Sequence, residues 1–325
     1  MLNDKNSRNK NAAPTIAKLS DKFIDALNES VELLHGYQLP EVTVKNTTIE
    51  PLPSLLDECR ALLQQADAKA PTPIRTVHHL ACTGGTLIVK CLAAMPNVQV
   101  LSEVNPLSPQ ALATTPAFFP TDLARLSHAS SRGADQQLLL DIFLAGLEVL
   151  YRNSFDNGLR LIVRDHAHSQ FCFGPLEPTR PTLRQVIEQQ YSVRSIVTVR
   201  HPLDSYLSLM NNGWCHFEPG NLDEYAVRYL AFLDRHKSCV TFKYEDFTES
   251  PDTVLSEMCA SLDMAFNPAY ADLFPAFKLS GDSGRSGNTI SPRQHREVPD
   301  LLRTQAESSE SWQALCHQLN YPPIF

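Results

Sequence analysis

Short apolar, β-branched runs alternate with longer amphipathic runs along most of the chain, and this alternation restricts the fold more than any other feature. The strand-like runs cover residues 74–80, 98–102, 159–164, 193–200 and 239–244. The main helix-like runs between them cover residues 86–94, 135–153, 203–211 and 222–236. Strands that alternate with helices form a mainly parallel sheet covered by helices on both faces. The sequence therefore predicts an α/β fold.

The length and composition suit one large core, since 43% of the 325 residues are hydrophobic. Apolar residues recur at helical spacing over residues 15–34, and Ala-Pro-Thr-Pro at residues 70–73 then breaks the structure. We predict a helical N-terminal extension over residues 1–72 and an α/β domain over residues 73–325.

Charge and cysteine usage narrow the range of partners. A net charge of −8 argues against binding to a nucleic acid polymer, which requires clustered Lys and Arg. No apolar run has the length of a signal peptide or a membrane span, so we expect a cytoplasmic protein without a membrane partner. The eight cysteines are scattered without a C-x-x-C pair, which predicts reduced packing residues and no zinc site. The sequence does not indicate an oligomeric state.

Polar residues follow every strand-like run. They are Cys82 to Thr86, Glu103, Arg164 to His166, Arg200, and Tyr244 to Asp246. In parallel sheets, ligands bind at the carboxyl ends of the strands. We therefore expect these residues to line one edge of the sheet and to form the active site.

The turn after the first strand has the character of a phosphate cradle. It reads Cys82-Thr83-Gly84-Gly85-Thr86-Leu87 and leads into a helix. Backbone N–H groups and the helix dipole at such a turn face an anion, and glycines let the main chain approach it closely. The turn lacks the lysine of the G-x-x-x-x-G-K-[ST] loop, which argues against an ordinary ATP or GTP enzyme.

A second motif runs from Arg200 to Ser208, where an arginine and a hydroxyl group have a spacing that suits one phosphate. The segment resembles the R-x-P-x-D-x-x-x-S motif of sulfotransferases that use 3′-phosphoadenosine 5′-phosphosulfate (PAPS). Residues 244–247, Tyr-Glu-Asp-Phe, resemble the family's Y-E-D-L strand and helix. The resemblance covers about residues 74–288.

This resemblance implies a sheet like that of P-loop NTPases, PAPS as the sulfuryl donor, and a small-molecule or glycan acceptor with a hydroxyl or amine. By position, residues 82–87 hold the 5′-phosphosulfate, and Arg200 with Ser208 holds the 3′-phosphate. A Gly-rich loop with Arg285, Ser286 and Gly287 lies over the nucleotide.

The family's P-K-[ST]-G-T-T loop has a basic residue where this chain has Cys82. Another cation must stabilise the leaving phosphate, because sulfuryl transfer, like phosphoryl transfer, depends on positioning and charge stabilisation. The candidates are Arg164, Arg285, His79 and Lys90. We favour Arg164 because it ends a strand, and we expect Lys90 at the surface.

Two sites offer a base for the acceptor. Glu103 resembles the strand-end glutamate of carbohydrate and tyrosylprotein sulfotransferases. The rival is His166, with Asp165 orienting its ring. The Asp165-His166-Ala167-His168 spacing lacks a further ligand motif, so no metal is predicted there.

The acceptor is expected to lie against two segments, residues 105–135 with Phe118 and Phe119, and residues 214–217 with Trp214. Two other functions stay open. The chain could bind a nucleotide without catalysis, as the missing cation suggests, or it could be a kinase with an atypical phosphate loop.

Overall fold

The computed structural model describes residues 24–25, 27–29, 31–32, 72–112, 119–281 and 289–325. The chain divides into two compact units, Met1–Pro71 and Thr72–Phe325. In the first unit only a few helical residues between 24 and 32 are described. The predicted extension over residues 1–72 therefore lies almost wholly outside the described residues and stays a prediction.

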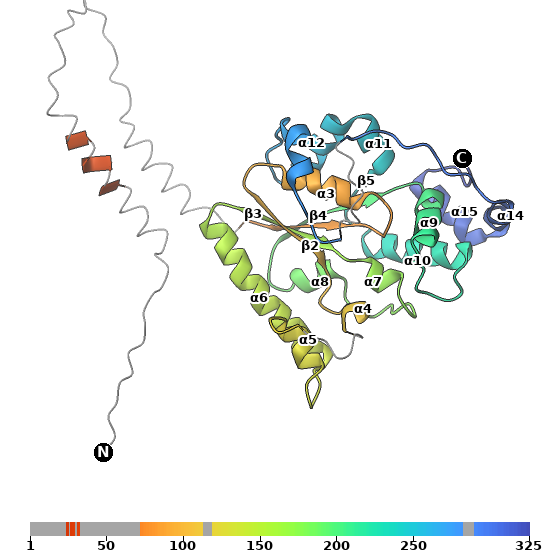
Figure 1. Cartoon of the computed structure of the whole chain (residues 1–325), viewed down its shortest axis with the longest axis horizontal. Coiled ribbons are helices and arrows are strands. Elements are labelled where there is room, and N and C mark those ends of the chain that lie inside the picture. Colours follow the sequence, from red (N-terminus) through yellow and green to blue (C-terminus); the bar gives the residue numbers. More distant parts are fainter. Residues whose placement is uncertain (1–23, 26, 30, 33–71, 113–118, 282–288) are drawn as a thin grey trace, which may run out of the picture. The chain divides into compact units, whose positions relative to one another are not determined.

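A parallel sheet of five strands forms the centre of the second unit (Figure 1). The strands are β1 (Ile74–His78), β2 (Val98–Val104), β3 (Arg160–Asp165), β4 (Val193–Val199) and β5 (Val240–Lys243). Their order in the sheet is β2-β3-β1-β4-β5, and every neighbouring pair is parallel. The predicted α/β fold with a parallel sheet is confirmed.

The helices follow the strands in alternation. They are α3 (Gly85–Ala93), α4 (Pro109–Leu112), α5 (Leu123–His128), α6 (Gln136–Asp156), α7 (His168–Phe171), α8 (Leu183–Ile187), α9 (Pro202–Asn211), α10 (Leu222–Arg235), α11 (Tyr244–Glu249), α12 (Pro251–Ser261), α13 (Tyr270–Leu273), the 3₁₀ helix η1 (Phe274–Ala276), α14 (Asp300–Ser308) and α15 (Glu310–Leu319). Local sequence explains several starts, since Asp135 and Asn221 cap α6 and α10, and Pro202 opens α9. Among the described residues, no helix has the length and apolar character needed to cross a membrane.

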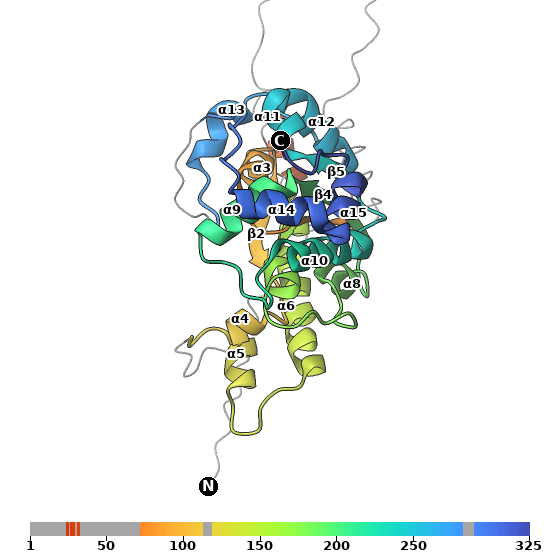
Figure 2. The same ribbon diagram turned by 90° about the vertical axis from the view of Figure 1, so that its right-hand side faces the viewer.

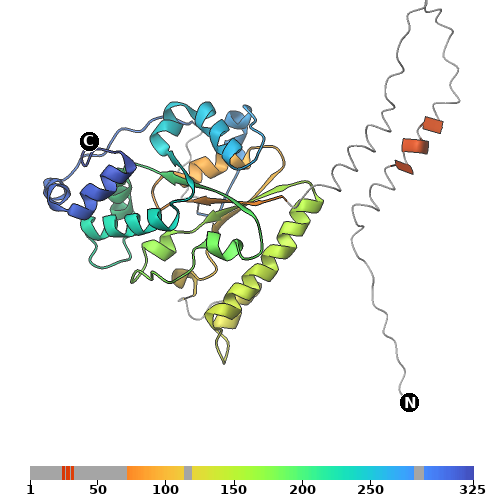
Figure 3. The ribbon, with the colours of Figure 1, turned by 180° about the vertical axis from the view of Figure 1, so that it is seen from behind.

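Helices cover both faces of the sheet (Figures 1 and 3). Helices α3 and α12 pack on one face, where Ile162 of β3 joins their core. Helices α6 and α8 pack on the other face, where Leu161 and Val163 contact Leu147. Successive residues of a strand point to opposite faces, so the continuous apolar run of β3 supplies both cores.

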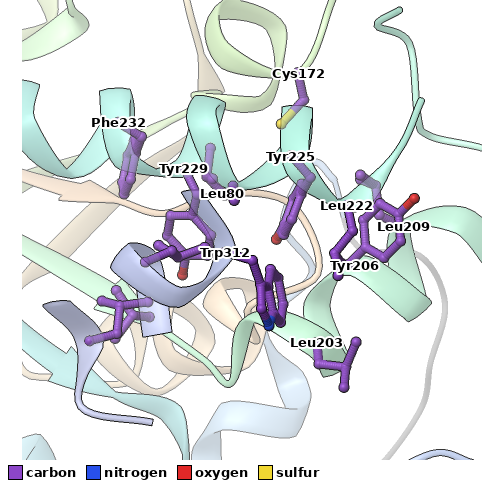
Figure 4. Packing of buried hydrophobic residues seen from close by; sticks show 14 of the residues in the cluster. Leu80, Cys172, Leu203, Tyr206, Leu209, Leu222, Tyr225, Tyr229, Phe232 and Trp312 are labelled. Atoms are coloured by element: carbon purple, nitrogen blue, oxygen red, sulfur yellow. The ribbon is translucent and has the colours of Figure 1, made fainter. Parts of the chain in front are cut away.

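Helices α9, α10, α14 and α15 lie together at one end of the sheet (Figure 2). Trp312 of α15 is fully buried beside Tyr225 and Tyr229 of α10 (Figure 4). Its indole nitrogen donates to the carbonyl of Pro323 at 3.0 Å. This packing supports α9, and α9 begins beside Arg200.

Candidate functional site

A cavity of about 650 Å³ opens at the carboxyl ends of the strands. Residues that follow all five strands line it, namely Cys82, Glu103, Arg164, Asp165, His166, Arg200 and Tyr244. Small-molecule sites commonly have volumes of about 300 to 1,000 Å³. The structure thus brings the polar strand ends together at the edge where parallel sheets bind their ligands.

The turn between β1 and α3 forms one wall. Gly84 has a φ of 84°, and α3 begins at the next residue. The N–H groups of a first helical turn have no partners within the helix, so they are available to an anion. Thr83 does not reach the cavity, because its buried hydroxyl donates to the carbonyl of Leu80 at 2.8 Å. Of residues 82–87, the other five line the cavity.

The two glycines of this turn are also required by packing. A Cβ atom at Gly84 would lie 2.2 Å from the ring of Tyr244, and one at Gly85 would lie 2.3 Å from the ring of His79. The turn therefore rests on two rings that follow β5 and β1. Glycine at both positions allows this contact as well as the approach of a ligand.

Gly84→Ala is expected to destabilise the protein and to abolish anion binding at the turn. The positive φ costs about 1–3 kcal/mol in a residue with a side chain, and the contact with Tyr244 adds to it. Gly146→Ala on the exposed face of α6 is the matched control, because a Cβ atom there meets nothing within 4 Å. Thermal unfolding and nucleotide titration of both variants test this. Wild-type stability and nucleotide affinity in Gly84→Ala would show that the tight turn is not needed.

Arg164 contacts several of the surrounding site residues, through all three nitrogens of its guanidinium. Its Nε donates to His79, one terminal nitrogen contacts Ser102 and Ser280, and the other contacts Thr86 and Glu103. The guanidinium is 3% exposed. The sequence favoured Arg164 as the leaving-group cation, but its N–H groups are already directed at protein oxygens and at His79. Its contacts suit a residue that positions Thr86 and Glu103.

His79 is not a cation in this site. Its Nδ1 lies 2.9 Å from the carbonyl of Leu80 and so carries the hydrogen, which leaves Nε2 to accept from Arg164. Burial, and then the charge of Arg164, lower the pKa of His79 to about 3. Lys90, which was expected at the surface, instead lines the cavity. Arg285, Ser286 and Gly287 lie outside the described residues.

Glu103 and His166, the two rival bases, face each other. One carboxylate oxygen of Glu103 lies 2.8 Å from Arg164, and the other lies 3.5 Å from Nε2 of His166. Glu103 has a φ of 61°, which is uncommon for a residue with a side chain. Gly281 packs against it so closely that a Cβ atom there would lie 2.2 Å from the carboxylate. The pair is thus held in place from several sides.

Asp165 does not orient His166. Its Oδ2 lies 2.8 Å from Nδ1 of His78, and both side chains are fully buried. Burial raises the pKa of Asp165 to about 6. The pairing of Asp165 with His166 in the sequence is therefore replaced by two pairs, Glu103 with His166 and Asp165 with His78.

Arg200 borders the cavity on the side of β4. Its contacts are long, at 3.4 Å to Asp204 and 3.5 Å to the carbonyl of Cys82, and its buried Nε has no hydrogen-bond partner. This guanidinium therefore has the capacity to bind an anion. Ser208, its partner in the motif, is 2% exposed on α9, and it is not among the described residues that line the cavity.

The residue after Tyr244 has a structural role. Glu245 accepts from the backbone N–H of His201 at 2.9 Å and from the hydroxyl of Tyr321 at 2.5 Å. It therefore joins the loop after β4 to the C-terminal segment, next to Arg200.

The acceptor segments contribute in part. The cavity is lined by Gln110, Trp214 and His216. Phe119 instead packs against Arg125, whose guanidinium carbon lies 3.2 Å from the centre of the phenyl ring. Phe118 lies outside the described residues. Lys278 and Arg293 also line the cavity, although the sequence did not single them out. Both flank the Gly-rich stretch, and this position is the only feature of the sequence that indicates a role for them in the site.

No protein-family model matches the sequence, and no curated protein matches it. The sulfotransferase domain from the curacin biosynthetic pathway is similar, at 15% identity and a TM-score of 0.49, over 78% of this chain and 99% of that domain. The sulfotransferase domain of the Synechococcus PCC 7002 olefin synthase is 15% identical with a TM-score of 0.45, over 79% of this chain and 97% of that domain.

A further similar structure is mouse sulfotransferase SULT7A1 complexed with PAP, at 12% identity and a TM-score of 0.38, over 79% of this chain and 89% of that protein. Similarity at this level does not assign an activity. These three solved structures are sulfotransferases, the family that the motifs at Arg200 and Tyr244 resemble.

Proposed function

We propose that this protein transfers a sulfuryl group from PAPS to an acceptor hydroxyl or amine. One observation carries the proposal: the glycine turn before α3 and the guanidinium of Arg200 border a single cavity that also contains the Glu103–His166 pair. Two anion-binding groups suit a donor with phosphates at both ends. The carboxylate–imidazole pair suits proton removal from an acceptor.

The residues present fit the nucleotide. The first turn of α3 offers N–H groups to the 5′-phosphosulfate, and Arg200, which borders the cavity, offers its guanidinium to the 3′-phosphate. Arg200 also reaches the carbonyl of Cys82 in the turn, so the two binding groups are adjacent. When bound, the donor would supply the sulfuryl group and a phosphate leaving group.

His166 takes the acceptor proton in this proposal, and Glu103 orients it. Because Nε2 of His166 faces Glu103, its hydrogen is directed at the carboxylate, and the Nδ1 lone pair is left for the acceptor. Arg164 fixes the other oxygen of Glu103. The Glu103 charge stabilises the imidazolium that forms, as a carboxylate does in hydrolytic triads.

Lys90 is the cation that this site offers to the leaving phosphate. It lies one turn after Thr86 on α3, so both side chains emerge on the same side of the helix, and both line the cavity. A lysine there replaces the basic residue that the turn lacks at Cys82.

Lys90→Met is expected to lower kcat by about 10²-fold, which is typical for the loss of one group that stabilises developing charge. The thermal midpoint should change little. Arg164→Met is expected to lower both kcat and the thermal midpoint, because Arg164 contacts His79 after β1, Ser102 on β2 and Thr86 on α3. Steady-state kinetics and thermal unfolding separate the two roles, and wild-type turnover by Lys90→Met would remove Lys90 from the reaction.

The proposed function is tested by titration and by transfer. Isothermal titration compares 3′,5′-diphosphoadenosine with adenosine 5′-monophosphate and ATP·Mg²⁺, and we expect the bisphosphate to bind most tightly. A transfer assay with sulfur-labelled PAPS then uses a phenol, a primary alcohol, a sugar and an amine as acceptors. A ligand at 100 times its dissociation constant adds about 2.7 kcal/mol of stability, so thermal shift gives an independent readout.

The outcomes distinguish the alternatives. Tight binding of the bisphosphate without transfer to any acceptor would indicate a non-catalytic nucleotide-binding protein. Preference for ATP·Mg²⁺ with phosphoryl transfer would indicate a kinase.

A further inference from the structure

Three buried side chains that the proposed reaction does not use meet next to the cavity, and one of them, Asp165, also lines it. They are His78 at the end of β1, Asp165 at the end of β3, and His236 directly after α10. One potential ligand atom of each lies within 4.8 Å of the others. All three are at most 2% exposed. Segments far apart in the sequence thus place two imidazoles and a carboxylate together in the protein interior.

Two atoms of this cluster lack a hydrogen-bond partner among the residues that the structure describes. They are Oδ1 of Asp165 and Nε2 of His236, and both are buried. Burying a polar atom without a partner costs about 1–3 kcal/mol, and more for a charged group. A cation between this carboxylate oxygen and this imidazole lone pair would satisfy both acceptors.

The outer ring nitrogen of His236 explains why its inner nitrogen is a lone pair. Nδ1 of His236 lies 2.8 Å from the carbonyl of Phe232, which only accepts, so Nδ1 carries the hydrogen and Nε2 does not. His78 differs, because without a metal its inner Nδ1 donates to Asp165 at 2.8 Å. Metal binding would use the other tautomer, in which the hydrogen lies on Nε2 and is donated to the hydroxyl of Thr76 at 2.8 Å. Metal-bound histidines generally donate their outer N–H to an oxygen in this way, and the arrangement fixes the ring orientation.

We propose that His78, Asp165 and His236 bind a divalent transition-metal ion, with zinc as the expected occupant. Nδ1 of His78, Nε2 of His236 and the carboxylate of Asp165 would supply three ligands, and a water molecule would take the fourth position. Two imidazoles with a carboxylate are a common ligand set for zinc. The site differs from the Asp165-His166-Ala167-His168 spacing, because it takes Asp165 with histidines from β1 and from the end of α10.

The geometry needs a small adjustment to hold the ion. Zinc bonds of about 2.0–2.1 Å place tetrahedral ligand atoms about 3.3 Å apart. The His78 and Asp165 ligand atoms are 2.8 Å apart, and the three ligand atoms are all within 4.8 Å. To reach the zinc spacing, His78 and Asp165 would move slightly apart, and ligand atoms up to 4.8 Å apart would move closer together.

The ion would act on the structure behind the proposed base. It would tie β1, β3 and the end of α10 together, one residue before His166. The carboxylate of Asp165 would then be neutralised without the help of His166, and His166 stays with Glu103. The inference is independent of the donor and acceptor, since none of its ligands contacts them in the proposed reaction.

Metal analysis of the purified full-length protein tests the proposal. The protein is prepared without a metal-affinity tag, and elemental mass spectrometry is expected to find equimolar zinc. X-ray absorption at the zinc edge should show only nitrogen and oxygen ligands at about 2.0–2.2 Å, without a sulfur shell at about 2.3 Å. A strong chelator should lower the thermal midpoint, and added zinc should restore it.

His236→Gln is expected to lose the metal. His201→Asn is the matched control, because His201 is also buried but lies outside this cluster, where its ring accepts from the N–H of Leu203 and packs against Tyr321 and Phe325. If His236→Gln does not fold, the X-ray absorption of the wild-type protein still decides the question. A protein without metal after zinc incubation, a sulfur shell, or zinc retained by a folded His236→Gln would each overturn the proposal. The first of these outcomes would indicate a proton shared between His236 and Asp165.

Discussion

Arg200→Ala is expected to weaken the binding of 3′,5′-diphosphoadenosine by about ten- to a hundredfold or more. A hydrogen bond to a charged group contributes about 1.5 to 3 kcal/mol, and a factor of ten in affinity corresponds to about 1.4 kcal/mol. The polar contacts that Arg200 makes with the described residues are long, so most of the loss should come from the ligand. Isothermal titration measures it.

Two comparisons isolate the contact with the 3′-phosphate. Adenosine 5′-monophosphate lacks this phosphate, so its binding should change little in Arg200→Ala. Arg194→Ala is the matched control, because Arg194 is exposed on the same strand, β4. Equal losses for both nucleotides would mean that Arg200 only supports the fold. Ser208→Ala should have a much smaller effect than Arg200→Ala, since Ser208 is buried on α9.

Glu103→Gln and His166→Ala are each expected to lower kcat by about 10² to 10⁴, the range of a general base, with little change in donor affinity. The two residues act as a unit, because the charge of Glu103 matters only through the imidazole that it faces. The kcat of the double variant should therefore be about the same as that of the less active single variant. Steady-state kinetics of the three variants measure this.

Chemical rescue separates the base from a structural role. Added imidazole should restore part of the activity of His166→Ala but none of that of Glu103→Gln, in which the ring is still present. His128→Ala, an exposed histidine at the end of α5, is the matched control and should behave as wild type. Full additivity in the double variant, or an active His166→Ala beside an inactive Glu103→Gln, would make Glu103 the base.

The strands and main helices were predictable from the sequence because they depend on local pattern. Each strand-like run agrees with β1 to β5 to within two residues at either end, since β-branched runs between turn residues form strands wherever a core covers them. The pairing of Glu103 with His166 was not predictable in this way. It requires β2 to lie beside β3, and the order of strands in the sheet depends on how the whole chain folds.

Two differences in the site have simple physical causes. Asp165 and His166 are adjacent where a strand ends, and adjacent side chains in extended backbone point to opposite sides, so Asp165 contacts His78 and His166 faces Glu103. Lys90 lies four residues after Thr86, and on a helix that spacing gives the same face. Both features follow from residue spacing, which the search for sequence motifs did not use.

The parallel sheet also has a consequence for how the protein acquires its ligand site. The turn at Gly84, the Glu103–His166 pair and Arg200 come from different crossovers, and β1 pairs with β3 and β4, which are far along the chain. Proteins dominated by contacts between distant segments fold slowly, because the chain entropy of long loops is lost before the contacts form. Because β1 pairs with β3 and β4, the cavity exists only once the connection that leads to β4 has folded. Nucleotide binding during refolding should therefore appear late, and it reports the completion of the fold better than secondary structure does.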